Sequence, residues 1–395
     1  MEKQTVKDVL EVGKENCCGC YGCKNICPVE AIEMVSDNYG FWYPEINSNK
    51  CINCGLCYKV CPTANVEPGE KRISHKYAMY NKNEEERINS SSGGIFILIA
   101  KKILDEDGVV FGAGFDEDYN IVHKFIKKEE DLYELMKSKY VQSKIGDSYK
   151  NAKELLDAGK NVLFTGTPCQ IEGLYRFLQK DYKNLFTQDF VCHGVPSPKS
   201  WKIFLNEILK KYKMKKSDNL EISFRNKDKG WKKFNLKIVD KNKNIVYCND
   251  LIKDPYLKMF LQNVSLRDSC FNCKFKKEYR MSDITLSDYW GAQKLEPKLD
   301  DDKGLSLISI NSEKGKELIS EIEENIIYKS TNFEKALSWN TCWTKSVPVN
   351  NKRHGFFGEI EEKNFEELSK KYETKENIFK KIKRYLLKIK SKILN

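Results

Sequence analysis

The chain repeats one cysteine pattern twice near its amino terminus, and this repeat constrains its folding more than any other feature. Each copy has the spacing C-x2-C-x2-C-x3-C-P. A [4Fe–4S] cube needs four thiolates and a tight loop supplies three, so each copy gives its last cysteine to the other copy's cluster. The first predicted ligand set is Cys17, Cys20, Cys23 and Cys61, and the second is Cys51, Cys54, Cys57 and Cys27.

Glycines within the repeat agree with this interpretation. Gly19, Gly22 and Gly55 keep side chains away from inorganic sulfide and leave N–H groups free to donate hydrogen bonds. A structural zinc site uses four ligands and has no need of eight cysteines in this arrangement. We therefore predict a bacterial 2[4Fe–4S] ferredoxin-like domain with two clusters over residues 1–65, in which Cys18 falls outside the register as a spectator.

Length and composition indicate a folded cytoplasmic protein of more than one domain. The chain has 395 residues, and one hydrophobic core rarely grows beyond about 250–300 residues. We find no apolar stretch near the ~20 residues of a membrane span and no secretory signal order at the amino terminus. Clustered cysteines in such a chain favour metal ligation over disulfides. The net charge of +11 suits an acidic partner such as a small ferredoxin, an RNA or an anionic membrane, or a merely solvated surface.

Apolar strands alternate with amphipathic helices after a linker at residues 63–75, and this rhythm predicts an α/β region. From residue 200 onward the pattern is α+β, with a strand-rich stretch at 220–247. The expected strands lie near 77–80, 109–115, 121–126, 161–166 and 185–191, and the expected helices at 94–106, 148–157, 170–179, 200–213 and 255–264.

Residues 378–395 form a basic amphipathic pattern, with apolar side chains three and four apart and seven bases on the other positions. Such a helix either packs on the body of the protein or docks on a partner or an anionic membrane surface. For a cytoplasmic protein, that surface is the inner face of the membrane. A nucleic-acid role is not expected, because the charge of the body is diffuse and no recognition motif accompanies it.

Three loop segments could bind the phosphates of a cofactor: 91–94, 139–143 and 165–170. Small hydroxyl and glycine residues before a helix expose N–H groups, and strand ends in α/β sheets are where ligands bind. Each segment is equally compatible with an ordinary helix cap. Because some 320 residues follow the ferredoxin-like domain, we expect its clusters to serve a redox reaction, for which a flavin is the usual link to two-electron substrates.

Six motifs in this order resemble the coenzyme F420 hydrogenase/dehydrogenase beta-subunit family, as far as about residue 330. The resemblance implies an oxidoreductase that binds FAD and a [4Fe–4S] cluster and passes electrons between the cluster and a substrate or hydride carrier. The motifs are Ser-Ser-Gly-Gly (91–94), Ser-Lys-Tyr-Val-Gln-Ser (138–143), Gly-Thr-Pro-Cys-Gln-Ile (166–171), Cys-His-Gly-Val-Pro-Ser (192–197), Cys-Phe-Asn-Cys (270–273) and Ser-Asp-Ile-Thr-Leu-Ser-Asp-Tyr-Trp-Gly (282–291).

The resemblance also implies site residues. From the residues alone, four distant cysteines could be either ligands of a third cluster or buried thiols; the resemblance favours the cluster, and Cys248 and Cys342 stay structural or free. The implied ligands of the third [4Fe–4S] cluster are Cys169, Cys192, Cys270 and Cys273. The implied FAD contacts are Ser91, Ser92, Gly93, Gly94, Lys139, Tyr140, Gln142, Ser143, Thr165, Gly166, Thr167 and Gln170.

The expected fold is therefore a multidomain α+β and α/β chain: the ferredoxin-like domain, an α/β flavin-binding domain in two parts at 76–155 and 156–330, and a carboxy-terminal extension at 331–395. The expected electron path runs from a ferredoxin-like donor through the clusters and FAD to a two-electron substrate or a deazaflavin carrier. The alternative is an electron-transfer subunit without a substrate of its own. Catalytic residues are not identified. Lys139 is a candidate charge near the flavin, and His193 either donates to the cluster or to a substrate or caps a strand end.

Overall fold

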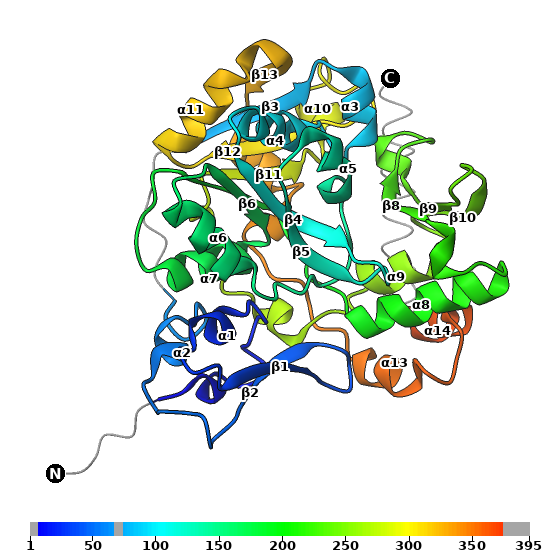
Figure 1. The fold of residues 1–395 in the computed structure, drawn as a ribbon. Helices are drawn as coiled ribbons and strands as arrows, with labels where there is room; N and C mark the ends of the chain where they lie inside the picture. The colour runs from blue at the N-terminus through cyan, green and yellow to red at the C-terminus, as the bar shows by residue number, and fades with distance from the viewer. Residues whose placement is uncertain (1–6, 67–73, 374–395) are drawn as a thin grey trace.

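The computed structural model describes residues 7–66 and 74–373. The amphipathic helix expected at 378–395 lies outside these residues. Within the described part, no helix is long and apolar enough to cross a membrane. The amino-terminal domain lies against one end of a larger body, and a further lobe of helices and strands flanks that body (Figure 1).

The two cysteine copies of the amino-terminal domain fold alike. Each copy enters a short helix, α1 (Gly22–Ile26) or α2 (Leu56–Lys59), directly after a residue in the left-handed conformation. That residue is Gly55 in the second copy but Tyr21 in the first, with φ of 71° and 66°. Between the copies, β1 (Ile32–Ser36) and β2 (Trp42–Ile46) form an antiparallel hairpin.

One eight-stranded mixed sheet forms the centre of the body. Its order is β13-β3-β12-β11-β7-β6-β4-β5, and β4, β6, β7 and β11 are parallel neighbours. The sheet includes strands from both 76–155 and 156–330. The strands are β3 (His75–Asn81), β4 (Val109–Phe115), β5 (Ile121–Ile126), β6 (Val162–Gly166), β7 (Leu185–Phe190), β11 (Ile284–Asp288), β12 (Ser306–Ile310) and β13 (Ile326–Ser330).

Helices cover both faces of this sheet, which explains why β4 and β6 are apolar along most of their length. Val110 and Leu163 pack with α4 (Ile95–Asp105) and α11 (Glu313–Glu321) on one face. Their neighbours Phe111 and Phe164 point the opposite way, as the period of a strand requires, and pack with α6 (Ser148–Asp157) and α7 (Pro168–Leu178). The remaining short helices of the body are α3 (Glu84–Asn89), α5 (Leu132–Leu135), α10 (Ala292–Leu295) and α12 (Phe333–Leu337).

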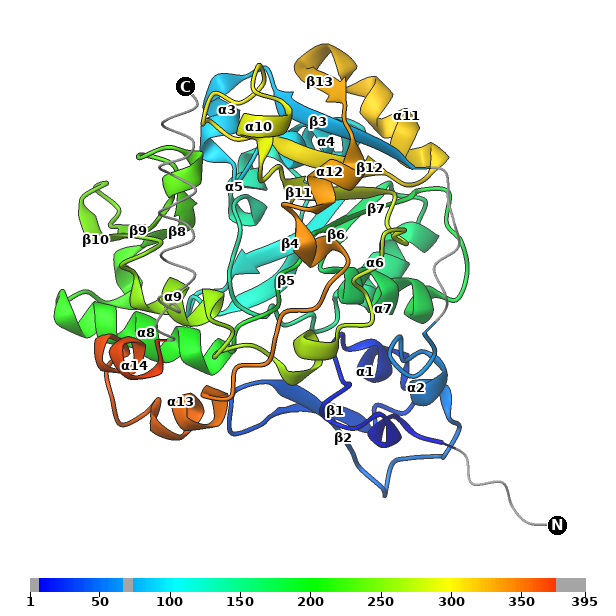
Figure 2. The same ribbon diagram turned by 180° about the vertical axis from the view of Figure 1, so that it is seen from behind.

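The flanking lobe is a three-stranded antiparallel sheet with helices that come from two parts of the chain. Trp201 and Phe204 pack with Phe356 and Phe365 in one aromatic core. The chain therefore crosses the back of the body to return to this lobe (Figure 2). The lobe contains α8 (Pro198–Lys211), β8 (Glu221–Asn226), β9 (Asn235–Val239), β10 (Ile245–Asp250), α9 (Pro255–Leu261), α13 (Arg353–Glu359) and α14 (Phe365–Tyr372).

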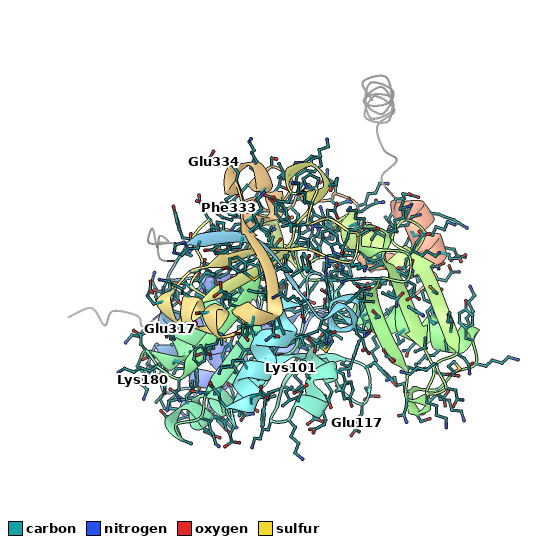
Figure 3. All side chains as sticks on the ribbon, turned by 90° about the horizontal axis from the view of Figure 1, so that it is seen from above. Lys101, Glu117, Lys180, Glu317, Phe333 and Glu334 are labelled. Carbon is teal, nitrogen blue, oxygen red and sulfur yellow. The ribbon has the colours of Figure 1, made fainter. Side chains whose placement is uncertain are left out.

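The expected elements are confirmed, with small shifts at their ends. Strands 109–115 and 121–126 and helix 148–157 have the expected bounds. The helix expected at 170–179 begins two residues earlier because Thr167 caps it and Pro168 suits its first turn. Charged side chains of both signs lie at the periphery, as Lys180 and Glu117 illustrate (Figure 3), and this agrees with the diffuse charge expected from the sequence.

Candidate iron–sulfur and redox site

The first predicted ligand set is gathered in the buried half of the amino-terminal domain. Cys20, Cys23 and Cys61 are buried and Cys17 is partly buried. Burial raises the pKa of the Cys23 thiol well above its usual range, and the nearby thiols of Cys20, Cys17 and Cys61 raise it further. The spacing prediction that Cys61 returns to the first copy agrees with this grouping. We call these four residues the inner set.

The second predicted ligand set lies nearer the surface. Cys54 is exposed, whereas Cys51, Cys57 and Cys27 are partly buried. Beside Cys54, the side chain of Ile52 is 60% exposed. The first copy therefore faces the body and the second copy faces solvent. We call Cys51, Cys54, Cys57 and Cys27 the outer set.

A close backbone approach holds the inner set against the body. At Gly173 of α7, a Cβ atom would lie 2.9 Å from Cys20 Cβ and 2.9 Å from the Tyr149 hydroxyl. Glycine at this position lets helix α7 and the first cysteine loop meet without a side chain between them. The helix that carries Cys169 is therefore the helix on which the inner set rests.

Arg267 provides a second link between the domain and the body. It is fully buried, and it donates from Nε to the Cys17 carbonyl at 2.7 Å and from Nη2 to the Trp42 carbonyl at 3.0 Å. Nη1 donates to Gln142 at 3.1 Å, and the guanidinium lies over the Tyr43 ring at 4.2 Å. Arg267 could not be found from the sequence, because a single arginine without a partner in its own segment carries no local signal.

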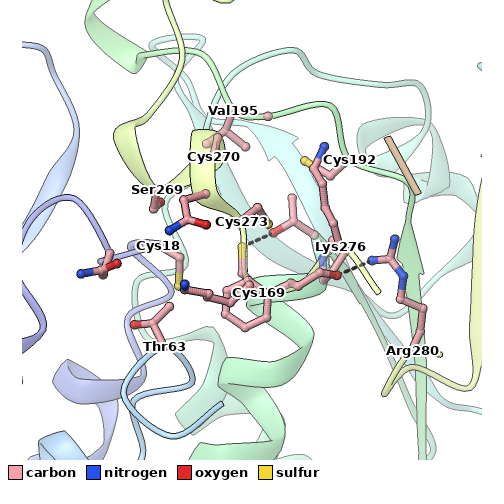
Figure 4. Close-up of a pocket in the computed structure, with 17 residues that line it drawn as sticks. Cys18, Thr63, Cys169, Cys192, Val195, Ser269, Cys270, Cys273, Lys276 and Arg280 are labelled. Atoms are coloured by element: carbon pink, nitrogen blue, oxygen red, sulfur yellow. Dashed lines mark hydrogen bonds between the residues drawn. The ribbon is translucent and has the colours of Figure 1, made fainter. Parts of the chain in front are cut away.

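The four distant cysteines line one pocket (Figure 4). Strands β6 and β7 are adjacent and parallel, with Gly166 opposite Asp189. Cys169, in the first turn of α7, and Cys192, two residues after β7, therefore lie at the same edge of the sheet. We call Cys169, Cys192, Cys270 and Cys273 the pocket set.

The chain from the flanking lobe returns to this edge through a short pairing. Pro196 forms an isolated bridge with Leu266, and the backbone N–H of Arg267 donates to the Val195 carbonyl at 3.0 Å. These contacts fix the loop after β7 beside the segment that carries Cys270 and Cys273. No local sequence pattern encodes this pairing, because more than sixty residues of the lobe separate its two sides.

The chemistry of the pocket suits a metal cluster that is coordinated by negatively charged thiolates. Burial raises the pKa of Cys192 well above its usual range, and the thiol of Cys270 adds to this effect. Lys276 and Arg280 also line the pocket. Their charges oppose the rise in the pKa of Cys273 that burial causes, and Arg280 also pairs with the buried Asp189. Among the described residues, no three metal-binding side chains converge on a single ion, whereas a cube binds each thiolate to a different iron. The donor set therefore fits a [4Fe–4S] cluster.

Cys18, to which the sequence interpretation gave no role, lies between the inner set and this pocket. It lines the pocket and packs with Cys20, Cys169 and Cys273. Hydrogen bonds with Cys169 and Cys20 raise the pKa of Cys18 well above its usual range, and they lower the pKa of both partners.

His193 does not point its ring at the pocket set. Its Nε2 atom lies 2.7 Å from Asn263 Oδ1 and its Nδ1 atom 3.6 Å from the Cys342 thiol. Burial lowers the pKa of the ring. The carbonyl of His193 accepts a hydrogen bond from Lys276 at 3.2 Å. These contacts favour a role of His193 at the strand end over donation to the cluster.

The loop segments predicted to contact a flavin touch one another in pairs. Ser91 accepts a hydrogen bond from the Ser138 backbone at 2.7 Å, next to Lys139. Gln170 donates to Ser143 at 2.9 Å. The segments 91–94, 139–143 and 165–170 are thus linked by hydrogen bonds at or next to their ends.

Most polar groups of these segments already have partners within the protein. Lys139 donates to the Glu134 and Met136 carbonyls at 3.0 and 2.7 Å, and burial lowers its pKa to about 7. Thr167 and Gln170 form a capping box at the start of α7. Helix α4, after Gly94, has no side-chain cap, so its first turn is the part of the three segments that best fits a phosphate.

The motif 282–291 contributes one residue to a buried ion pair. The arginine of this pair interacts with the side chain of Tyr140. Asp288, the last residue of β11, pairs with Arg225 of β8. The guanidinium lies 5.6 Å from the Trp290 ring centroid, and Trp290 stacks on Trp231 with centroids 5.0 Å apart. This pair joins the flanking lobe to the sheet next to one of the predicted flavin segments.

Comparison with known proteins identifies the two parts of the chain. Residues 159–336 match the family model for the carboxy terminus of the coenzyme F420 hydrogenase/dehydrogenase beta subunit. Residues 16–65 match a 4Fe–4S dicluster domain, and a second model of that description matches 43–92. The resemblance seen in the sequence, to a 4Fe–4S dicluster domain followed by a part similar to this beta-subunit family, is therefore confirmed.

Two relatives illustrate the similarity. The chain is 26% identical over 242 residues to a coenzyme F420-dependent sulfite reductase from Methanocaldococcus jannaschii, covering 60% of this chain. The match spans only 35% of that longer protein. A chain of the F420-reducing [NiFe] hydrogenase complex from Methanosarcina barkeri is 18% identical with a TM-score of 0.44, over 69% of this chain and 90% of that one.

Proposed function

We propose that this protein is an iron–sulfur flavoprotein oxidoreductase that connects a one-electron donor such as a small ferredoxin with a two-electron substrate or a deazaflavin carrier such as coenzyme F420. The inner and outer sets would each hold one [4Fe–4S] cluster and the pocket set a third, with FAD beside segments 91–94, 139–143 and 165–170. When bound, the clusters supply one-electron transfer and the flavin joins single electrons to hydride chemistry.

The observation that carries this proposal is the contact between the inner set and the pocket set. Cys20 of the inner set and Cys169 of the pocket set both pack against Cys18. Cys54 of the outer set is exposed to solvent. The protein thereby arranges three groups of thiols in order from its surface to its sheet. None of the fifteen cysteines forms a disulfide, which suits a reducing compartment such as the cytoplasm.

One observation favours a second candidate, an electron-transfer subunit without a substrate of its own. The side chains of Lys139, Thr167 and Gln170 are engaged by the protein itself, so fewer groups remain for FAD than the sequence led us to expect. This candidate keeps the three clusters and omits the flavin.

The test is a cofactor assay on full-length protein purified without oxygen. Three clusters give about twelve irons per chain, against about eight for the dicluster domain alone. The variant Cys270→Ser/Cys273→Ser should lose about four irons, whereas Cys248→Ser, which changes an exposed cysteine on β10, should lose none. Released FAD supports the flavoprotein, and twelve irons without flavin support the second candidate. Eight irons in the unaltered protein would remove the pocket cluster.

A further inference from the structure

Cys18 is the one cysteine of the repeat that the spacing leaves without a ligand position. Its side chain is nevertheless only 8% exposed. It packs against Cys20 on the side of the inner set. It also packs against Cys169 and Cys273 on the side of the pocket (Figure 4). A thiol in this position lies between two groups of proposed ligands.

The backbone of Cys18 is held from the body side. Gln142 donates to the Cys18 carbonyl at 3.2 Å and accepts from Arg267 at 3.1 Å. The next residue, Gly19, has φ of +67°, and a Cβ atom there would lie 2.7 Å from Gln142 Nε2. The left-handed glycine and the glutamine together fix the direction in which the Cys18 side chain leaves the loop.

The proposed ligand sets leave no iron of a [4Fe–4S] cluster for Cys18 to bind. A [4Fe–4S] cluster binds four thiolates, and each of the two neighbouring sets already has four cysteines. Cys18 therefore has no iron to bind in this arrangement. A protonated thiol is a hydrogen-bond donor, and a thiolate bound to iron is an acceptor.

We propose that Cys18 is a positioning residue shared by the inner set and the pocket set, whose thiol donates its hydrogen bond to the ligand sulfur of Cys20 or of Cys169. This inference rests on the proposed function, because it needs a cluster at both sets. A hydrogen bond to a ligand sulfur stabilises the more negative, reduced form of a cluster and raises its reduction potential. Because the thiol has one proton, it serves one sulfur at a time, so the two potentials depend on a single residue.

The experiment compares Cys18→Ala and Cys18→Ser with the unaltered full-length protein and with Cys248→Ala. Iron is counted first, and the potential of each cluster is then measured by a redox titration followed by electron paramagnetic resonance. We expect about twelve irons in all four proteins. Cys18→Ala should shift two of the three potentials to more negative values, and Cys18→Ser, which keeps a donor, should restore much of this shift. The outer cluster and Cys248→Ala should stay unchanged.

Each other outcome contradicts a different statement. Eight irons in the unaltered protein would refute the pocket cluster itself. Twelve irons with all three potentials unchanged in Cys18→Ala would refute the role of Cys18 and leave the proposed function intact. A loss of about four irons in Cys18→Ala, with Cys18→Ser equally depleted, would show that Cys18 is a ligand and not a hydrogen-bond donor.

Discussion

Arg267 Nε donates a 2.7 Å hydrogen bond to the carbonyl oxygen of Cys17, although 250 residues separate the two in sequence. The same guanidinium reaches toward the Cys17 sulfur, at 3.6 Å from Nη2. A fully buried positive charge is costly unless it is paired. Its position here indicates that it faces a group with negative charge, which the thiolates of the inner set would supply.

Replacing this arginine tests that relationship. Arg267→Met should lower the free energy of unfolding by about 3 kcal/mol, because the Cys17 and Trp42 carbonyls lose a charged donor. It should also make the potential of the inner cluster more negative. The matched control is Arg87→Met, another buried arginine, paired with Asp301 in the body. A similar shift of the potential in both variants would contradict a specific role for Arg267.

Because Gly173 lies so close to the first cysteine loop, adding one methyl group there should lower the stability of the protein. Gly173→Ala would place a Cβ 2.9 Å from Cys20 Cβ, and overpacking of this kind costs about 1–3 kcal/mol. Gly358→Ala is the control, since no atom lies within 4 Å of a Cβ there. Chemical denaturation measures both. Equal stability of the two variants would show that the first cysteine loop moves freely on α7.

The exposed rim of the outer set predicts where an electron donor docks. Ile52→Asp should slow reduction of the clusters by a small ferredoxin about tenfold, since apolar contacts at the centre of an interface carry much of its binding energy. Ile252→Asp alters an even more exposed isoleucine, 79% against 60%, in the flanking lobe. Stopped-flow reduction compares the two. If Ile252→Asp slows reduction as much, the donor docks elsewhere.

Acid should weaken the fold through His123. Its Nε2 lies 3.0 Å from the Thr165 carbonyl, and burial lowers its pKa from 6.5 to about 4. Between these two values the unfolded chain binds a proton that the folded chain does not, so stability falls as pH drops through this window, by up to about 1.4 kcal/mol per pH unit. The unfolding free energy at pH 7 and 5.5 should change less in His123→Gln. An equal change in both proteins would contradict the assignment.

Local patterns were sufficient for much of this molecule. Val109–Phe115 and Val162–Gly166 are apolar runs between turns, and a strand buried on both faces needs nothing more to be recognised. The spacing of the repeat likewise predicted that Cys61 returns to the first copy, because the geometry of the cube dictates the exchange.

Contacts between distant segments could not be predicted in this way. The approach of Cys270 to Cys192 depends on the bridge between Pro196 and Leu266, whose two sides are separated in sequence by strands and helices of the flanking lobe. Cys18 looked like an extra residue because its partners, Cys20 aside, lie more than a hundred residues away. Likewise, Gly94 at the start of α4 has φ of +83°. This backbone conformation favours glycine whether or not a phosphate binds there.

Strand β3 pairs on both sides with the last strands of the sheet, β12 and β13. During synthesis, His75–Asn81 therefore leaves the ribosome long before residues 306–330. Until β12 and β13 are made, the backbone N–H and C=O groups of β3 lack their strand partners. Long-range pairing of this kind slows folding and exposes a strand edge that invites aggregation. The dicluster motifs, complete by residue 62, have no such delay. We expect nascent chains to acquire a finished amino-terminal domain while the body still depends on chaperones.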